Sequence, residues 1–151
     1  MEPDKKKGRY LRIHQQLEEL LKKTADRDAR MATIVAVLHH KMNYFFWTGF
    51  YLLTNGELIV KTYQGPLACQ VLEKDKGVCW AGINQEKTIV VPDVHRFAGH
   101  IACDSRSRSE IVVPVKDKQG KIIGVLDIDS TSLNSFDEID ARNLEKIVAL
   151  L

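Results

Sequence analysis

The stretch EIVVPVKDKQGKIIGVLDID, residues 110–129, decides the fold because it contains two apolar runs around a polar turn. The runs are rich in Val and Ile, which favour β-strands, and the turn from Lys116 to Lys121 suits an antiparallel hairpin. Asp127 and Asp129 lie two positions apart, so both side chains point to the same face of their strand. The stretch therefore predicts a hairpin with acidic side chains on one face.

A second hairpin is expected upstream. YFFWTGFYLL is aromatic and apolar throughout, which is typical of a buried central strand. The group TNG follows, and its turn-forming residues predict a tight connection to the run GELIVKTY. Two further runs read as strands, LACQVLE after a Gly-Pro break and TIVVPDV ending at a proline. These four strands are expected at residues 44–53, 56–63, 67–73 and 88–92.

Four segments are predicted to be helical. In three of them the apolar residues recur with the spacing of one helix face. The remaining segment begins with a glycine and contains small residues, which suits a short helix. Asp26 or Asp28 is expected to cap the second helix, and Ser135, with Glu138 three residues later, the last. The expected helices are residues 9–23, 26–42, 77–87 and 135–151.

This order of elements predicts an α+β fold in one domain, residues 1–151. We expect a central antiparallel sheet with the N- and C-terminal helices packed on one face. The segment from His95 to Ser109 has no apolar periodicity and is rich in Gly, Ser, Asp and Arg. Because long loops without regular structure are uncommon in compact domains, we expect this one to be functional.

Composition excludes several classes of function. The chain is 44% hydrophobic and 28% charged, and it contains no apolar run of membrane-spanning length. A net charge of +2 is too small to favour nucleic acid or an anionic membrane as partner. The first residues are polar and basic, which predicts no secretory signal and a cytoplasmic location. Thiols are normally kept reduced there.

The chain contains three cysteines, Cys69, Cys79 and Cys103. An odd number in a cytoplasmic protein does not suit a structural disulfide framework, so they are catalytic, metal-binding or simply buried thiols. A buried, inert thiol is the ordinary alternative for each. Zinc is chemically conceivable with His95 and His100 as further ligands, but no Cys-x-x-Cys pair is present and the spacing matches no common zinc module.

Cys103 stands apart because it lies in a polar stretch, GHIACDSRSRSEI, residues 99–111. The neighbouring His100, Arg106 and Arg108 would lower the pKa of its thiol, whereas Asp104 would raise it. Charge counting therefore leaves the sign of the shift open. An exposed thiol among polar groups is still a poor core residue, which favours a reactive role.

Two other groups allow both a plain and a functional interpretation. Glu110, Asp127 and Asp129 are either a solvated strand end or a pocket for an ammonium group with one acid kept protonated. Trp47 and Tyr51 lie four apart on one strand and so share a face. They are either core residues or an aromatic wall around a small apolar or methylated group.

Taken together, several motifs resemble the GAF-domain free methionine-(R)-sulfoxide reductases. They are WTGFYLL, GPLAC, GVC, PDVHRFAGHIACD, SRSEIVVPV and IIGVLDIDST, in this order. The similarity runs from about Trp47 to Thr131 and continues through the flanking helices. It implies a GAF-like fold and an enzyme that reduces the free amino acid, with no cofactor and no metal.

The resemblance also implies roles for individual residues. Cys103 would be the nucleophile, Cys69 the resolving cysteine, and Cys79 an exchange partner or a bystander. The three acids, Glu110, Asp127 and Asp129, would hold the substrate's ammonium group and help to protonate its oxygen. The aromatic pair, Trp47 and Tyr51, would form the wall against the S-methyl group. Thioredoxin or a similar dithiol protein would restore the enzyme, which is expected to be a homodimer.

Two features depart from the family pattern, the pair FF before Trp47 and the residue Trp80, and other functions compete. Trp80 stands where a small residue is expected after GVC, which bears on the exposure of Cys79. The main alternative is a non-catalytic GAF domain that senses a small molecule. A redox sensor that reports oxidation through a Cys69–Cys103 bridge and a zinc-binding interaction module are further alternatives. Turnover of a specific sulfoxide separates the enzyme from the two sensors, and a zinc module would show stoichiometric metal after purification in the presence of reductant.

Overall fold

A computed structural model describes residues 1–100 and 103–151; Ile101 and Ala102, in the middle of the predicted functional loop, lie outside the described residues. The described residues form a six-stranded sheet in the order β3-β2-β1-β6-β5-β4, and all neighbouring strands are antiparallel. The strands are β1 (Trp47–Thr54), β2 (Glu57–Gln64), β3 (Val71–Leu72), β4 (Ile89–Val91), β5 (Ser109–Lys116) and β6 (Ile122–Ser130). The predicted α+β fold is confirmed.

Both predicted hairpins are present. The β1–β2 turn is formed by Asn55 and Gly56, whose φ angles of 53° and 82° suit the left-handed conformation that a two-residue hairpin needs. β5 and β6 pair along their whole length and β6 also pairs with β1, so β1 and β6 are central. The central position of β1 is the one that the aromatic run predicted. Side chains of these strands alternate between the two faces.

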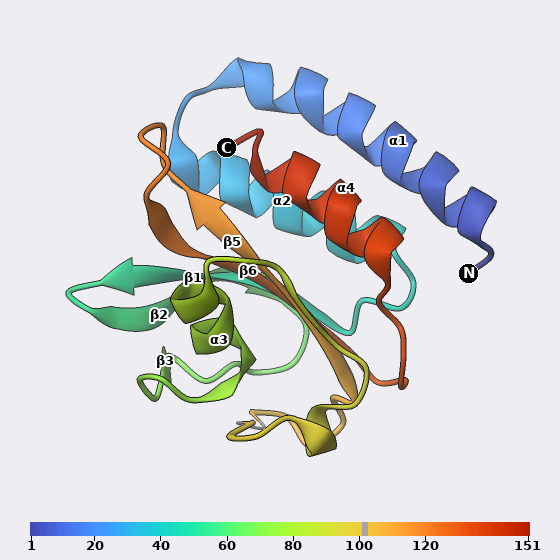
Figure 1. Cartoon of the computed structure of the whole chain (residues 1–151). Coiled ribbons are helices and arrows are strands. Elements are labelled where there is room, and N and C mark those ends of the chain that lie inside the picture. Colours follow the sequence, from blue (N-terminus) through green and yellow to red (C-terminus); the bar gives the residue numbers. More distant parts are fainter. Residues whose placement is uncertain (101–102) are drawn as a thin grey trace.

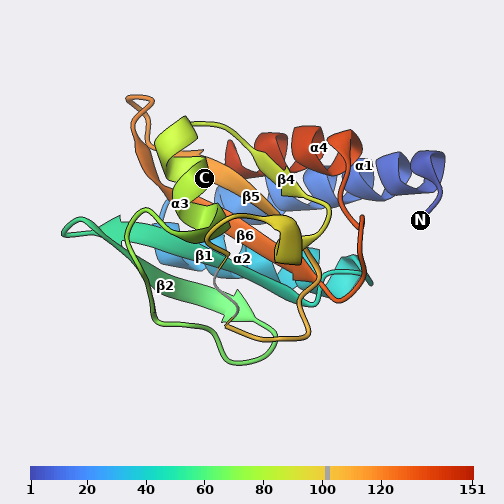
Figure 2. The same ribbon diagram turned by 60° about the horizontal axis from the view of Figure 1, so that its bottom comes forward.

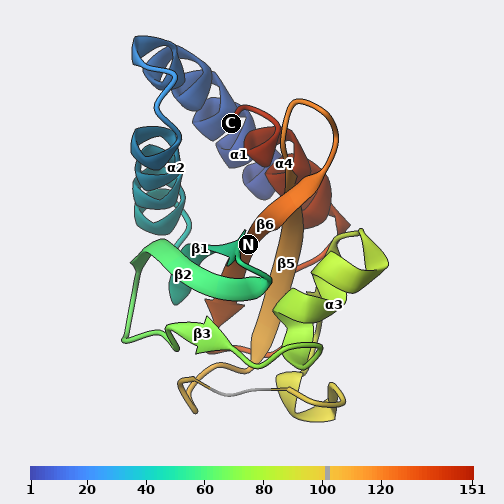
Figure 3. The ribbon, with the colours of Figure 1, turned by 90° about the vertical axis from the view of Figure 1, so that its left-hand side faces the viewer.

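Three helices cover one face of the sheet (Figures 1 and 3). These are α1 (Pro3–Leu20), α2 (Arg27–Lys41) and α4 (Glu138–Val148). Their apolar side chains pack on the even-numbered residues of β1, such as Phe50, and on Ile111 and Leu126. This confirms that the N- and C-terminal helices share a face. A single turn, η1 (Leu21–Lys23), extends α1.

The opposite face carries α3 (Gly77–Gln85), which Figure 2 brings in front of the sheet together with the turn η2 (Val94–Arg96). Val78, Cys79 and Trp80 of α3 pack there on Val112 and Val125. The sheet is therefore covered on both faces, by three helices on one and a short helix on the other.

Three boundary predictions are wrong. α1 begins at Pro3 instead of residue 9, since Pro3 and Asp4 suit a first helical turn, and Lys6 forms a buried ion pair with Asp140, 2.7 Å away on α4. The strand predicted over 67–73 is limited to β3. The cap of α4 is Asp137, which forms a capping box with Asp140. Asp26 caps α2, as one of the two expected alternatives.

Among the described residues, no helix is both long and apolar enough to cross a membrane.

Candidate active site

A small cavity of about 50 Å³ lies on the α3 side of the sheet. Of the eight candidate site residues that the sequence predicts, seven line this cavity: Trp47, Tyr51, Cys79, Cys103, Glu110, Asp127 and Asp129. The eighth, Cys69, is joined to the cavity by its bond to Cys103. The fold therefore brings together residues that are spread over more than 80 positions of the chain.

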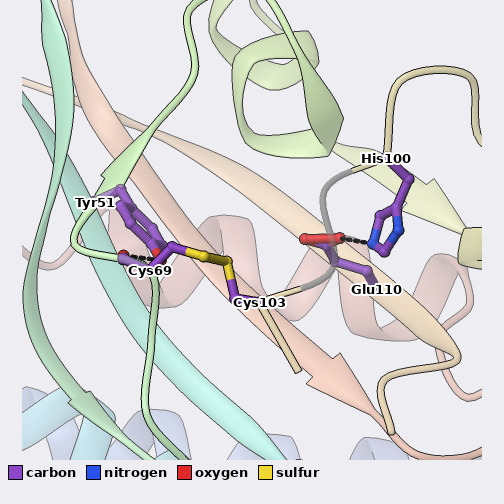
Figure 4. Close-up of a disulfide and its surroundings, with 5 residues drawn as sticks. All are labelled: Tyr51, Cys69, His100, Cys103 and Glu110. Carbon is purple, nitrogen blue, oxygen red and sulfur yellow. Dashed lines mark hydrogen bonds and ion pairs between the residues drawn. A yellow bond between two sulfur atoms is a disulfide. The ribbon is translucent and has the colours of Figure 1, made fainter. Parts of the chain in front are cut away.

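Cys69 and Cys103 form a disulfide, although 34 positions separate them in the sequence (Figure 4). Their Cα atoms lie 5.5 Å apart, within the usual range for such a bridge. Cys103 is exposed and Cys69 is half-buried. The hydroxyl of Tyr51 donates a hydrogen bond of 2.9 Å to the carbonyl oxygen of Cys69, which ties this segment to β1.

The three acids meet because β5 and β6 are in register. Glu110 pairs with Asp129, and Asp127 follows two positions earlier on the same face. Burial raises the pKa of Glu110 well above its ordinary value, and the charges of Asp127 and Asp129 raise it further. Burial also raises the pKa of Asp127, to about 6, and that of Asp129. The cluster therefore retains protons where exposed carboxyl groups would be ionised.

The aromatic wall is formed by stacked rings. The ring of Trp47 stacks on Tyr51 at 5.8 Å and on Tyr63 at 5.3 Å between ring centroids. Gly49 allows this arrangement, since a Cβ at its position would come within 2.5 Å of the Trp47 ring. The participation of Tyr63 was not anticipated, because it depends on the register of β1 with β2, which shifts between Gly49 and Tyr51.

Two polar atoms at the cavity have no hydrogen-bond partner among the described residues: Nε1 of Trp47 and Oδ1 of Asp127. Both residues are at least nine-tenths buried and both line the cavity. Unpartnered buried polar atoms are rare in folded proteins, and each calls for an explanation such as a ligand. The cavity thus offers one free donor and one free acceptor.

Cys79 is a free, buried thiol near the start of α3. Burial, followed by the charge of Asp127, raises the pKa of this thiol well above its ordinary value. Trp80 points elsewhere: its indole Nε1 donates to the carbonyl oxygen of Leu72, 3.3 Å away, and it does not line the cavity. The bulky ring therefore fastens β3 to α3 and leaves Cys79 at the cavity wall.

The charged neighbours of Cys103 are largely engaged with one another. Arg106 donates to both carboxylate oxygens of Asp104, at 2.9 and 2.7 Å, and these bonds lower the pKa of Asp104 to about 2. His100 faces Glu110, with 3.9 Å between Nε2 and Oε2 (Figure 4). Burial lowers the pKa of His100, so its ring is mainly neutral at pH 7. His100 lines the cavity, whereas His95 does not.

A family model described as a GAF domain matches residues 24–151. The chain is 50% identical over 147 residues to GAF domain-containing protein A of Dictyostelium discoideum, covering 97% of this chain and 92% of that protein. It is 42% identical over 123 residues to the free methionine-R-sulfoxide reductase of Escherichia coli, covering 82% of this chain and 74% of that protein.

A solved structure gives the same comparison in three dimensions. The X-ray structure of the free methionine-R-sulfoxide reductase of Neisseria meningitidis, in complex with its substrate, superimposes with a TM-score of 0.89. Sequence identity is 41%, and the superposition covers 93% of this chain and 84% of that one. The similarity therefore extends over sequence and fold alike.

Proposed function

Because the chain belongs to the free methionine-R-sulfoxide reductases of the GAF-domain family, we propose that it reduces free L-methionine-(R)-sulfoxide to L-methionine by thiol chemistry. The observation that carries the proposal is the cavity that joins a Cys69–Cys103 bridge, three buried acids and an aromatic wall. Each of the three parts matches one part of the substrate: sulfur, ammonium group and methyl group.

The first step needs a nucleophile and a proton donor. A sulfoxide sulfur is a weak electrophile until its oxygen is protonated or strongly hydrogen-bonded. Glu110 retains its proton because it is buried beside two other carboxyl groups, so it is the acid that supplies the proton. Attack by the thiolate of Cys103 transfers the oxygen to that sulfur, which releases methionine and leaves a sulfenic acid.

The second step uses the other half of the bridge. The thiol of Cys69 condenses with the sulfenic acid of Cys103 and expels water. The 5.5 Å between the two Cα atoms supports this pairing, since it lies within the usual range for a disulfide. Cys79 is buried and its pKa is raised, so it is a poor nucleophile and stays outside the exchange.

Recognition of the free amino acid follows from the charges. Asp127 and Asp129 hold the substrate's ammonium group, and Oδ1 of Asp127 is the acceptor that lacks a partner. A residue within a peptide has an amide in place of the ammonium group and so leaves these acids unpaired, at a substantial cost in binding. Trp47 and Tyr51 contact the S-methyl group, and the free Nε1 of Trp47 donates to an oxygen of the substrate.

The bridged state is the product of the reaction. Its cavity of about 50 Å³ is far below the roughly 300–1,000 Å³ of ordinary ligand pockets. The enzyme must therefore be reduced, and opened, before it binds the next substrate. A cytoplasmic dithiol protein such as thioredoxin reduces it by attack on the bridge at Cys103, the more exposed of the two cysteines. Assembly as a homodimer remains a prediction.

A single turnover tests the proposed steps. Reduced protein is mixed with one equivalent of free L-methionine-(R)-sulfoxide, and the cysteine-containing peptides are identified by mass spectrometry. We expect one equivalent of methionine and a new Cys69–Cys103 bridge. A redox sensor would instead form the same bridge with hydrogen peroxide and leave the sulfoxide unchanged, which would contradict the proposal.

A further inference from the structure

Three metal-binding side chains meet at the buried side of the cavity. Sγ of Cys79, an oxygen of Glu110 and an oxygen of Asp127 all lie within 4.8 Å of one another. They come from α3, β5 and β6, and all three side chains are buried. Bond lengths of about 2.0–2.3 Å around a tetrahedral zinc ion place its ligand atoms roughly 3.5 Å apart. Small inward movements of these side chains would therefore complete three corners of such a site.

A second observation also points to a cation. Asp127 is only 6% exposed and its Oδ1 has no partner among the described residues, although it lines the cavity. A buried carboxylate oxygen without a donor destabilises the protein until a cation or a hydrogen-bond donor reaches it. Lys76 also lines the cavity, but its ammonium group lies 2.8 Å from a carboxylate oxygen of Glu73.

We propose that Cys79, Glu110 and Asp127 bind one thiophilic divalent cation, zinc being the cellular ion of this kind, and that the bound ion inhibits the enzyme. The ion occupies the place that the proposed function gives to the substrate's ammonium group. The binding stands on the geometry alone, whereas the inhibition rests on the proposed function. The ion is an inhibitor that competes with the substrate, and the reaction does not require it.

The ligand set selects the metal. One thiolate and two carboxylates suit zinc or cadmium, whereas magnesium prefers octahedral sites made only of oxygen. Each ligand binds in its deprotonated form, so the ion displaces the protons that the cluster holds. The fourth position opens to the cavity, where water or, after reduction, the thiolate of Cys103 completes the coordination.

Binding is measured on the oxidised protein, in which Cys79 is the one thiol left of three cysteines. Titration with cadmium should produce the ultraviolet band of a cadmium–thiolate bond, and dialysis against zinc should give one ion per chain. Magnesium should not compete. Cys79→Ser should abolish the band, and Asp127→Asn should weaken zinc binding by roughly tenfold or more.

Asp104→Asn is the matched control, because this acid lines the same cavity but is paired with Arg106. It should leave binding unchanged. Failure of zinc to bind, or binding that survives Cys79→Ser, overturns the proposal. This experiment needs no turnover, so its result is independent of whether the protein reduces any sulfoxide.

Inhibition is measured as the ratio of rates with and without zinc, for wild type and for Cys79→Ser in the same assay. Effects of zinc on the reductant cancel in this comparison. We expect zinc to raise the KM for the sulfoxide in the wild type, with kcat unchanged, and to do so much less in the variant. An equal effect on both proteins overturns the inhibitory role.

Discussion

Glu110 pairs directly with Asp129 across the β5–β6 ladder, so two carboxyl groups share one face of the sheet. Like charges directly opposite each other destabilise a sheet. The arrangement is tolerated because burial keeps protons on the cluster, as the raised pKa of each of these two acids indicates. The clustered acids therefore lower the stability of the fold, and they provide the site with a bound proton and with a place for an ammonium group.

Asp127→Asn should stabilise the protein at pH 8 while impairing its activity. In the folded protein the pKa of Asp127 is about 6, above the ordinary value of 3.8. Well below pH 3.8 both states are protonated and the side chain contributes nothing to the pH dependence. As the pH rises from about 4 to 6, the unfolded chain releases its proton first, so wild-type stability falls; above pH 6 the loss is constant.

The measurement is thermal unfolding of both proteins at pH 4 and pH 8. We expect the variant to be more stable at pH 8, by an amount on the order of 3 kcal/mol or several degrees in Tm. The difference should shrink at pH 4. A variant less stable than wild type at pH 8 would show that the ionised carboxylate is stabilised by contacts within the cavity.

Cys103→Ser and Cys69→Ser should fail at different steps. Without Cys103 the first step is lost, so no methionine should form. Without Cys69, one equivalent of methionine should still form, after which Cys103 remains as a sulfenic acid that a dimedone probe labels. Equal single-turnover yields from the two variants would contradict the assigned roles.

Tyr51→Phe tests the hydrogen bond that holds the Cys69 segment. The hydroxyl of Tyr51 donates to the Cys69 carbonyl at 2.9 Å, and the ring would be kept in the variant. We expect slower closure of the disulfide after methionine release, with little change in KM and a loss of stability of about 1 kcal/mol. Rapid-quench trapping of free thiols measures the closure rate; closure at the wild-type rate would remove Tyr51 from this role.

Asp140→Ala should destabilise the fold without touching the cavity. Asp140 is fully buried and accepts from the ammonium group of Lys6 and from the hydroxyls of Tyr10 and Tyr44. Its removal leaves the buried ammonium group with Asp137 alone, at 3.2 Å. Breaking a buried pair in this way costs about 3–5 kcal/mol, measurable by urea unfolding. The double variant Lys6→Met/Asp140→Ala should recover part of the loss; no recovery would show that the tyrosine contacts dominate.

The fold was largely predictable because the spacing of apolar residues distinguishes the helices from the strands in this sequence. Two apolar runs around a polar turn in residues 110–129 predicted the β5–β6 hairpin, and the two-residue period of a strand placed Asp127 and Asp129 on one face. The start of α1 was not predictable from the apolar spacing, which begins at Tyr10; Pro3 and Asp4 are its local start signals, and Lys6 meets a residue 134 positions away. Ser135 fits a capping pattern, yet its hydroxyl donates to the carbonyl oxygen of Ser132, and Asp137 caps α4.

The site was predictable in its parts but not in its assembly. Family resemblance supplied the cysteine roles, and alternation supplied the shared face of the acids. The position of α3 over the sheet is a non-local property, so the approach of Cys79 to Asp127 and the contact of Trp80 with Leu72 could not be anticipated. The pairing of His100 with Glu110 likewise depends on the path of the segment before β5.

The most direct test is turnover of free L-methionine-(R)-sulfoxide by the reduced protein, coupled to thioredoxin, thioredoxin reductase and NADPH. The S epimer, a peptide-bound sulfoxide and the Cys103→Ser variant serve as controls. We predict NADPH consumption with the free R epimer alone, abolished by Cys103→Ser. Absence of turnover with every sulfoxide, from folded and reduced protein, would contradict the account and indicate a ligand-sensing or redox-sensing GAF domain.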